Sequence, residues 1–148
     1  MVESPHEAGL LYAGTDDGLV HITRNGGGSW SDITPGNFGE GIVNSIEVSP
    51  HDPATAYVVV MRYKNMDLTP YIFKTNDYGN SWKSITEGID GAHNFVRVVR
   101  EDKKRKGLLY AGTETGLFVS WNDGKQWERL QLNPVSYTHL TLPTIYSV

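Results

Sequence analysis

The sequence predicts an all-β fold built of repeated four-stranded units, on three observations. A strand-like run, LYAGTDDGL at 11–19, returns 98 residues later as LYAGTETGL at 109–117, with a weaker copy, AYVVV, at 56–60. Each run precedes a turn-like pattern that ends in Trp, and successive Trp residues lie 52 and 45 residues apart. No segment shows sustained helical periodicity. Because this period suits a β-propeller blade, we predict a propeller fragment of just under three blades.

Composition and charge exclude several classes of partner and site. The chain has 148 residues, of which 39% are hydrophobic and 11% aromatic, enough for a packed core. Its net charge of -4 lacks the cationic surplus that attracts nucleic acid, so we expect no nucleic-acid partner. No stretch approaches the length of a membrane span, and we expect no membrane insertion. The absence of cysteine excludes disulfides, thiolate metal sites and cysteine nucleophiles.

Each unit reads as four short strands, A to D, separated by turns rich in Gly, Asn and Asp. In the unit at 41–91 the strands are expected at 42–48, 56–63, 71–74 and 81–85. In the unit at 92–134 they are expected at 95–100, 108–112, 117–120 and 126–130. The unit at 1–40 is expected to contain only strands B, C and D, because its strand A would precede Met1.

A turn pattern follows strand C in every unit: Ser or Thr, then Asp or Asn two positions on, Gly at four and Trp at seven. The three copies are Thr23, Asn25, Gly27 and Trp30; Thr75, Asp77, Gly79 and Trp82; and Ser120, Asn122, Gly124 and Trp127. The Asp or Asn side chain can accept hydrogen bonds from backbone amides one to three residues ahead. The Gly can take positive φ, and the Trp can cover the turn. We therefore expect these residues to be structural.

Calcium binding is the alternative for these turns, since loops of this type also bind Ca²⁺. A calcium loop needs six or more oxygen ligands, whereas 23–30 contains no carboxylate. The five histidines also lack metal-ligand spacing, and His51, in a turn bounded by prolines, is expected to be solvated surface. We predict neither a metal site nor a cofactor.

The turn pattern resembles the Asp-box, or BNR, repeat, whose consensus T-x-D-x-G-x-S-W is matched by Thr75 to Trp82. Residues 8–134 resemble large bacterial propeller proteins labelled glycosyl hydrolase or sortilin (VPS10)-like. The resemblance implies an exported protein in which the boxes lie on the outer edge of each blade, away from the ligand face. It therefore indicates architecture and not chemistry.

The segment 135–148 breaks with the repeat. It carries no formal charge, and VSYTHLTLPT is similar to the translation of a transposase adaptor used in DNA sequencing libraries. The alternative is a genuine C-terminal strand, since Leu140, Leu142 and Ile145 alternate with polar residues. We expect this tail to be non-native and the sequence of the natural protein to have been cut by the library junction near Pro134.

Propeller ligands usually bind over the central channel, beside the loops that join strand D to A and strand B to C. In this chain those loops span 16–18, 35–41, 63–70, 88–94 and 114–116. Candidate ligand-face residues are Asp17, Arg62, Asp67, His93, Arg97 and Glu114. Arg97 and Arg100 are expected to point apart and to be ordinary ion-pairing or channel residues.

No spacing identifies the two carboxylates that a glycosidase requires, so no catalytic residue is predicted. We expect a non-catalytic fragment that presents loops for carbohydrate, peptide or protein binding and packs against the remaining blades. One alternative is part of a glycoside hydrolase, sialidase- or xyloglucanase-like, whose catalytic carboxylates lie mainly in missing blades; another is a purely structural spacer. Because three blades cannot close, residues 1–134 alone are expected to be poorly soluble or to associate.

Overall fold

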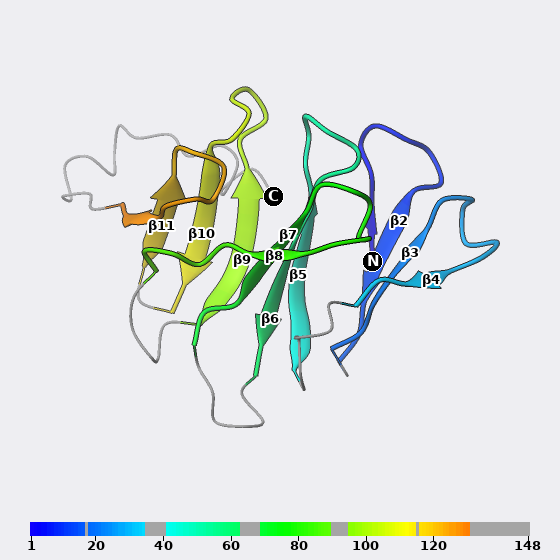
Figure 1. Ribbon diagram of the computed structural model, residues 1–148, viewed down its shortest axis with the longest axis horizontal. Helices are drawn as coiled ribbons and strands as arrows, with labels where there is room; N and C mark the ends of the chain where they lie inside the picture. Colours follow the sequence, from blue (N-terminus) through cyan, green and yellow to red (C-terminus); the bar gives the residue numbers. More distant parts are fainter. Residues whose placement is uncertain (17, 35–40, 63–68, 90–94, 115, 131–148) are drawn as a thin grey trace.

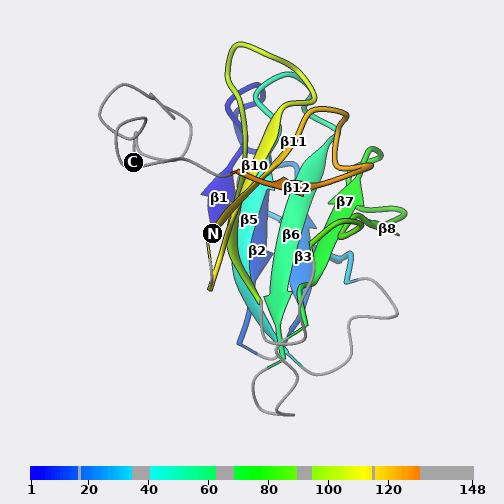
Figure 2. The same cartoon turned by 90° about the vertical axis from the view of Figure 1, so that its left-hand side faces the viewer.

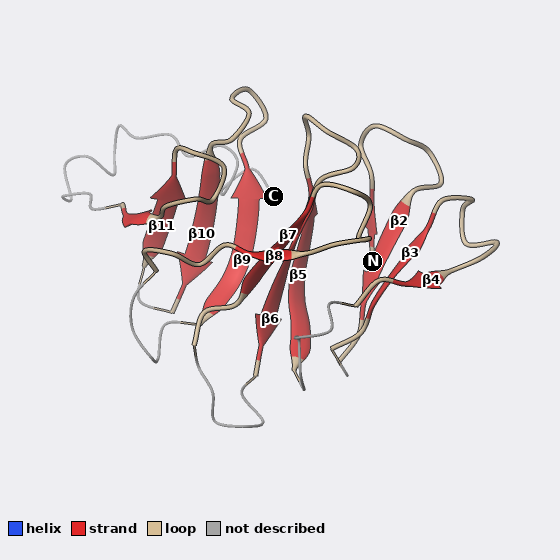
Figure 3. Ribbon diagram, in the orientation of Figure 1, coloured by secondary structure: helices blue, strands red, loops and turns tan. Residues whose placement is uncertain are grey.

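The computed structural model describes residues 1–16, 18–34, 41–62, 69–89, 95–114 and 116–130. These residues form three four-stranded antiparallel sheets and no helix. Figure 1 shows the sheets side by side, in chain order from right to left, and Figure 3 shows that strands and loops make up the whole of this part. The predicted all-β architecture is confirmed. No helix in the described part is long and apolar enough to cross a membrane.

We call the sheets blades one to three. Blade one contains β1 (Val2–Glu3), β2 (Leu11–Gly14), β3 (Val20–Thr23) and β4 (Ser31–Asp32). Blade two contains β5 (Ile42–Val48), β6 (Ala56–Met61), β7 (Ile72–Thr75) and β8 (Lys83–Ser84). Blade three contains β9 (Val96–Glu101), β10 (Leu109–Thr113), β11 (Leu117–Ser120) and β12 (Glu128–Arg129). In every blade the strands pair in chain order.

Blade one has an inner strand, and the expectation that it would begin at strand B was wrong. In β1, Val2 pairs with Tyr12 and Glu3 pairs with Leu11. The sequence contained a signal for this strand, because Ser-Pro-His at 4–6 repeats Ser-Pro-His at 49–51, which directly follows β5. The short β1 therefore occupies the position of the last two residues of β5.

The outer strands are shorter than expected. Strand D was placed at 81–85 and 126–130, but β8 and β12 each contain two residues. In β8 only Lys83 and Ser84 pair with β7, after which the amide of Ile85 donates to the carbonyl of Ile72. The inner strand β5 and the strand β11 have the expected bounds.

The core lies between blades rather than within them. Alternate residues of a strand face opposite sides of its sheet, so Val58 packs against blade one while Val59 packs against blade three. Figure 2 shows the blades behind one another, as this packing requires. Gly14 permits close approach of blades one and two, because a Cβ at this position would overlap Val43 Cγ1.

Histidines join the blades at the turns between strands A and B. His6 Nε2 lies 2.9 Å from the carbonyl oxygen of Ser49, and His51 Nε2 lies 2.6 Å from that of Asp102. In each turn the serine two positions earlier, Ser4 or Ser49, accepts a hydrogen bond from the histidine amide at 3.1 Å. The expectation that His51 is solvated surface was therefore wrong, because its ring is used in a contact with the next blade.

Candidate functional site

The three turns after strand C share one hydrogen-bond pattern. In the second, the Thr75 hydroxyl accepts from the Gly79 amide at 2.9 Å, and Asp77 Oδ1 accepts from the Ser81 amide at 2.9 Å. The bonds from Gly27 to Thr23, Gly124 to Ser120, Ser29 to Asn25 and Gln126 to Asn122 are equivalent. Each acceptor therefore takes the amide four residues ahead, one position beyond the expected range. Hydrogen bonds from Ser81 and Thr75 hold the pKa of the Asp77 carboxyl below its ordinary value.

Two successive residues of each turn adopt positive φ. The glycines Gly27, Gly79 and Gly124 have φ values of 100°, 88° and 85°. The residues before them are Gly26, Tyr78 and Asp123, with φ values of 71°, 59° and 67°. The first of these two positions was not anticipated from sequence, because Tyr adopts this conformation rarely.

Two of the three tryptophans of these turns bind the preceding blade. Trp82 Nε1 donates to the carbonyl of Ile33 at 2.7 Å, and Trp127 Nε1 donates to that of Ile85 at 2.5 Å. Trp127 is buried, whereas Trp30 of blade one is 40% exposed. The turns therefore stabilise junctions between blades as well as their own hairpins.

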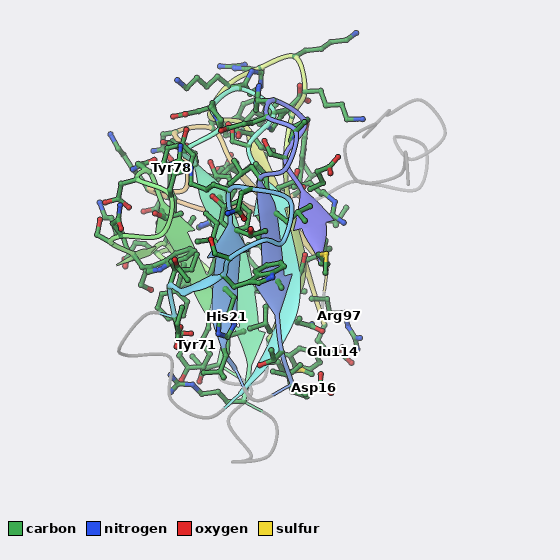
Figure 4. All side chains as sticks on the ribbon, turned by 90° about the vertical axis from the view of Figure 1, so that its right-hand side faces the viewer. Asp16, His21, Tyr71, Tyr78, Arg97 and Glu114 are labelled. Atoms are coloured by element: carbon green, nitrogen blue, oxygen red, sulfur yellow. The ribbon has the colours of Figure 1, made fainter. Side chains whose placement is uncertain are left out.

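Two of the candidate ligand-face residues meet. Arg97 on β9 places Nε and Nη2 at 3.1 and 2.5 Å from Glu114 Oε2, and both side chains are exposed. The Arg97 guanidinium also lies 5.0 Å from the centre of the Phe95 ring. Figure 4 shows the pair adjacent at one end of the blades, the end where Asp16 also lies. The Glu114 carboxylate is thus held by a cation.

Of the other candidates, Arg62 is the one that lies among the described residues. Arg62 stacks on the ring of Tyr71, with its guanidinium carbon 4.4 Å from the ring centre. Asp17, Asp67 and His93 lie outside the described residues.

A groove of about 250 Å³ follows the inner strands. It is lined by Met1, Val2, Gly14, Val43, Asn44, Ser45, Ile46 and Arg100. Arg100 Nη1 donates to the Ser45 hydroxyl at 3.4 Å, and Asn44 Nδ2 donates to the carbonyl of Arg97 at 3.3 Å. Arg97 and Arg100 therefore have different partners, as expected for side chains that point apart. We call Asn44, Ser45, Glu47 and Arg100 the inner-strand cluster.

Glu47 is the acidic member of this cluster. Its side chain is 19% exposed, and its Oε1 lies 3.8 Å from Arg100 Nη1. Glu47 Oε2 accepts a hydrogen bond from the Glu101 amide at 3.2 Å. Burial raises the pKa of the Glu47 carboxyl, although this hydrogen bond and Arg100 oppose the shift. Glu47 also borders a second hollow of about 420 Å³, between the inner strands and Lys103.

Sequence reasoning missed Asn44, Ser45 and Glu47. A signal was present, since these polar residues interrupt the otherwise apolar run of β5, IVNSIEV. The cluster supplies amide, hydroxyl and guanidinium donors beside a carboxylate, which suits the recognition of a polar ligand. Among the described residues, no group of three His, Cys, Asp or Glu side chains could hold a metal ion.

Comparison with solved structures relates this geometry to known folds. An ancestral GH74 enzyme is similar over 91% of this chain and 18% of its own, with a TM-score of 0.71 and 20% identity. YCF48 from Cyanidioschyzon merolae is similar over 95% of this chain and 39% of its own, with a TM-score of 0.65 and 16% identity. YCF48 bound to the D1 peptide is similar over 86% of this chain and 42% of its own, with a TM-score of 0.59 and 19% identity.

The GH74 xyloglucanase from Xanthomonas campestris is also similar, with a TM-score of 0.62 and 17% identity over 89% of this chain and 23% of its own. No family model matches the sequence, and no curated protein matches it. The described blades are therefore part of a β-propeller fold. The chain spans less than half the length of each of these solved structures.

Proposed function

We propose that this chain is a non-catalytic part of a larger β-propeller and that its inner-strand cluster binds a peptide or carbohydrate. The observation that carries the proposal is the groove beside Asn44, Ser45 and Arg100, whose side chains supply hydrogen-bond donors. Glu47 adds an acceptor beside Arg100. Such a set can bind hydroxyl, amide or carboxylate groups without a metal or cofactor.

The solved neighbours support both ligand classes. One YCF48 structure contains a D1 peptide, and another neighbour is a xyloglucanase. The Arg97 and Glu114 pair, at the end of the blades where the loops from B to C lie, would be a further polar contact for either ligand.

The first partner that we propose is the rest of the propeller. Trp82 and Trp127 donate to carbonyls of the preceding blade, while the equivalent Trp30 is 40% exposed. A further blade on this side would give Trp30 the same acceptor and would cover its ring.

A second candidate function is part of a glycoside hydrolase whose catalytic carboxylates lie mainly in other blades. The observation that favours it is the raised pKa of Glu47, since a general acid must remain protonated near its working pH. Glu47 is, however, held near Arg100, which favours its ionised form. We therefore prefer the binding function.

Arrays of xyloglucan oligosaccharides and of short synthetic peptides, probed with the full chain, test the proposal. Arg100→Gln should weaken the signal on one array by roughly tenfold, the scale for loss of a charged hydrogen bond, and Asn44→Ala, which removes a neutral donor, should weaken it less. Lys104→Gln, in an exposed turn, is the matched control and should bind like the parent. No binding on either array, or equal binding by all variants, would contradict the proposal. Reducing-sugar release from xyloglucan that Glu47→Gln abolishes would establish the hydrolase instead.

A further inference from the structure

A hollow of about 340 Å³ lies between blades two and three, beside the outer strands and away from the inner-strand cluster. It is lined by Lys74, Asn76, Lys83, Ser84, Ile85, Glu87, Asp123, Gly124 and Lys125. Its volume falls at the small end of ligand sites, which are roughly 300–1,000 Å³. Three lysines and two acidic residues give the lining a net positive charge.

The side chains at the base of the hollow include a lysine and an aspartate whose charges cancel. Lys74 on β7 is 8% exposed, and its Nζ forms an ion pair with Asp123 Oδ2. The Tyr57 hydroxyl donates to Asp123 Oδ1 at 3.2 Å. Because Lys74 and Tyr57 both hold the Asp123 carboxylate, its negative charge is compensated at the base of the hollow.

Two lysines at the rim have no such compensation. Lys83 on β8 lies directly opposite Lys74 in the strand ladder, so both side chains lie on the same face of the sheet. Lys125 borders the hollow from the turn of blade three. In the part of the chain that the structure describes, the ammonium groups of Lys83 and Lys125 have neither an ion-pair nor a hydrogen-bond partner. Like charges opposite each other on strands are unfavourable, and a bound anion would relieve the repulsion.

The equivalent junction between blades one and two has a different composition. Ile22 occupies the position of Lys74, and Tyr78 occupies that of Asp123. The Tyr78 ring packs against the apolar core there, with the Arg24 guanidinium stacked on it at 4.0 Å. An aromatic ring therefore packs at the first junction, whereas the shorter, charged Asp123 stands at this position in the second.

We propose that the hollow between blades two and three binds a compact oxyanion carried on a sugar ring, either the carboxylate of a uronic acid or a sulfate ester. Lys83 and Lys125 bind the anion at the rim, away from the carboxylate of Asp123. The Ser84 hydroxyl and Asn76 Nδ2, which also line the hollow, can bind ring hydroxyls, while Asn76 Oδ1 already accepts from the Thr55 hydroxyl at 3.2 Å. The site lies on the outer edge of the blades and is separate from the proposed inner-strand site.

Isothermal titration calorimetry of the full chain at low ionic strength tests the site. The probes are galacturonic acid, glucose 6-sulfate, glucose and inorganic sulfate. Galacturonic acid, glucose 6-sulfate or both should bind, while glucose and inorganic sulfate should bind at least tenfold more weakly. The acidic sugar that binds more tightly shows whether the site takes a carboxylate or a sulfate ester. Added salt should weaken binding, because exposed charges are screened.

Variants locate the site. Lys83→Gln and Lys125→Gln should each lower the affinity about fivefold, as expected for loss of one charged contact, and the double variant should abolish binding. Lys104→Gln is the control and should leave the affinity unchanged, and unaltered thermal unfolding would show that all variants fold. The proposal is overturned if neither acidic sugar binds, if inorganic sulfate binds as tightly as they do, or if the double variant retains affinity.

Discussion

Lys74 and Asp123 form an ion pair across the junction of blades two and three, and Tyr57 donates a hydrogen bond to the same carboxylate. The Lys74 side chain is 9% exposed and that of Asp123 is 43% exposed, so one partner is buried and the other reaches solvent. Lys74 on β7 and Asp123 in the turn after β11 are 49 residues apart in sequence.

Removing the charge of Asp123 should destabilise this junction. Asp123→Asn leaves the Lys74 ammonium buried without its partner, and Asn tolerates the positive φ of 67° at this position. We expect a loss of about 2 kcal/mol in the free energy of unfolding, less than for a fully buried pair because solvent reaches Asp123. Urea unfolding measures the change, and Lys104→Gln, in an exposed turn, is the control. The double variant Lys74→Met, Asp123→Asn should lose less than the two single changes combined; strict additivity would argue against a direct interaction.

Replacing the tryptophans should have unequal effects. Trp82→Phe and Trp127→Phe remove the donors to the Ile33 and Ile85 carbonyls, and each should lower the free energy of unfolding by about 1–3 kcal/mol, counting the unpaired acceptor. Trp30→Phe should cost less than ~0.5 kcal/mol, because an exposed side chain contributes little. Equal losses at all three positions would contradict the proposed role in blade junctions.

The close approach at Gly14 predicts a steric conflict that a second change relieves. A Cβ at Gly14 would overlap Val43 Cγ1, so Gly14→Ala should destabilise the chain by about 1–3 kcal/mol through overpacking. Gly14→Ala with Val43→Ala should recover part of this loss. Thermal unfolding of both variants checks the prediction. A neutral effect of Gly14→Ala alone would show that blades one and two can move apart at no cost.

Asp77 should contribute to stability at neutral pH and lose that contribution in acid. Its pKa is held below the ordinary value of 3.8 by hydrogen bonds to its ionised form. The contribution is therefore present above pH 3.8 and is lost as the pH falls through the lower, folded-state pKa. Asp77→Asn should keep the turn intact, as Asn25 and Asn122 do in the other blades. The variant should show a smaller drop in melting temperature between pH 5 and pH 2 than the parent; an unchanged drop would refute this.

Local patterns predicted much of this structure. The bounds of β5 and β11 follow from runs of apolar and β-branched residues, and the turn residues from the spacing of Thr, Asp, Gly and Trp. Local patterns failed for β1, because two residues carry too little periodicity to indicate a strand. The lengths of the outer strands β8 and β12 were overestimated, because strands of two residues show too little alternation to mark where they begin and end.

The candidate sites were harder to predict. The Arg97 and Glu114 pair joins two residues that the sequence had placed on one face, but their contact depends on the turn that brings the Glu114 amide to the Phe95 carbonyl. Glu47 and Arg100 meet because β5 and β9 are inner strands of neighbouring blades. No short-range pattern relates residues that lie about one blade apart in the chain.

The sequence by itself determined the blade period, the all-β class and the chemistry of the turns, because these depend on contacts within a few residues. Only the tertiary structure decided which side chains meet between blades: Lys74 with Asp123, His51 with Asp102, and Trp82 with Ile33. The physical reason is that each blade buries its faces against its neighbours. A residue's partner then depends on the packing of two sheets, and the same repeat position holds Tyr78 at one junction and Asp123 at the next.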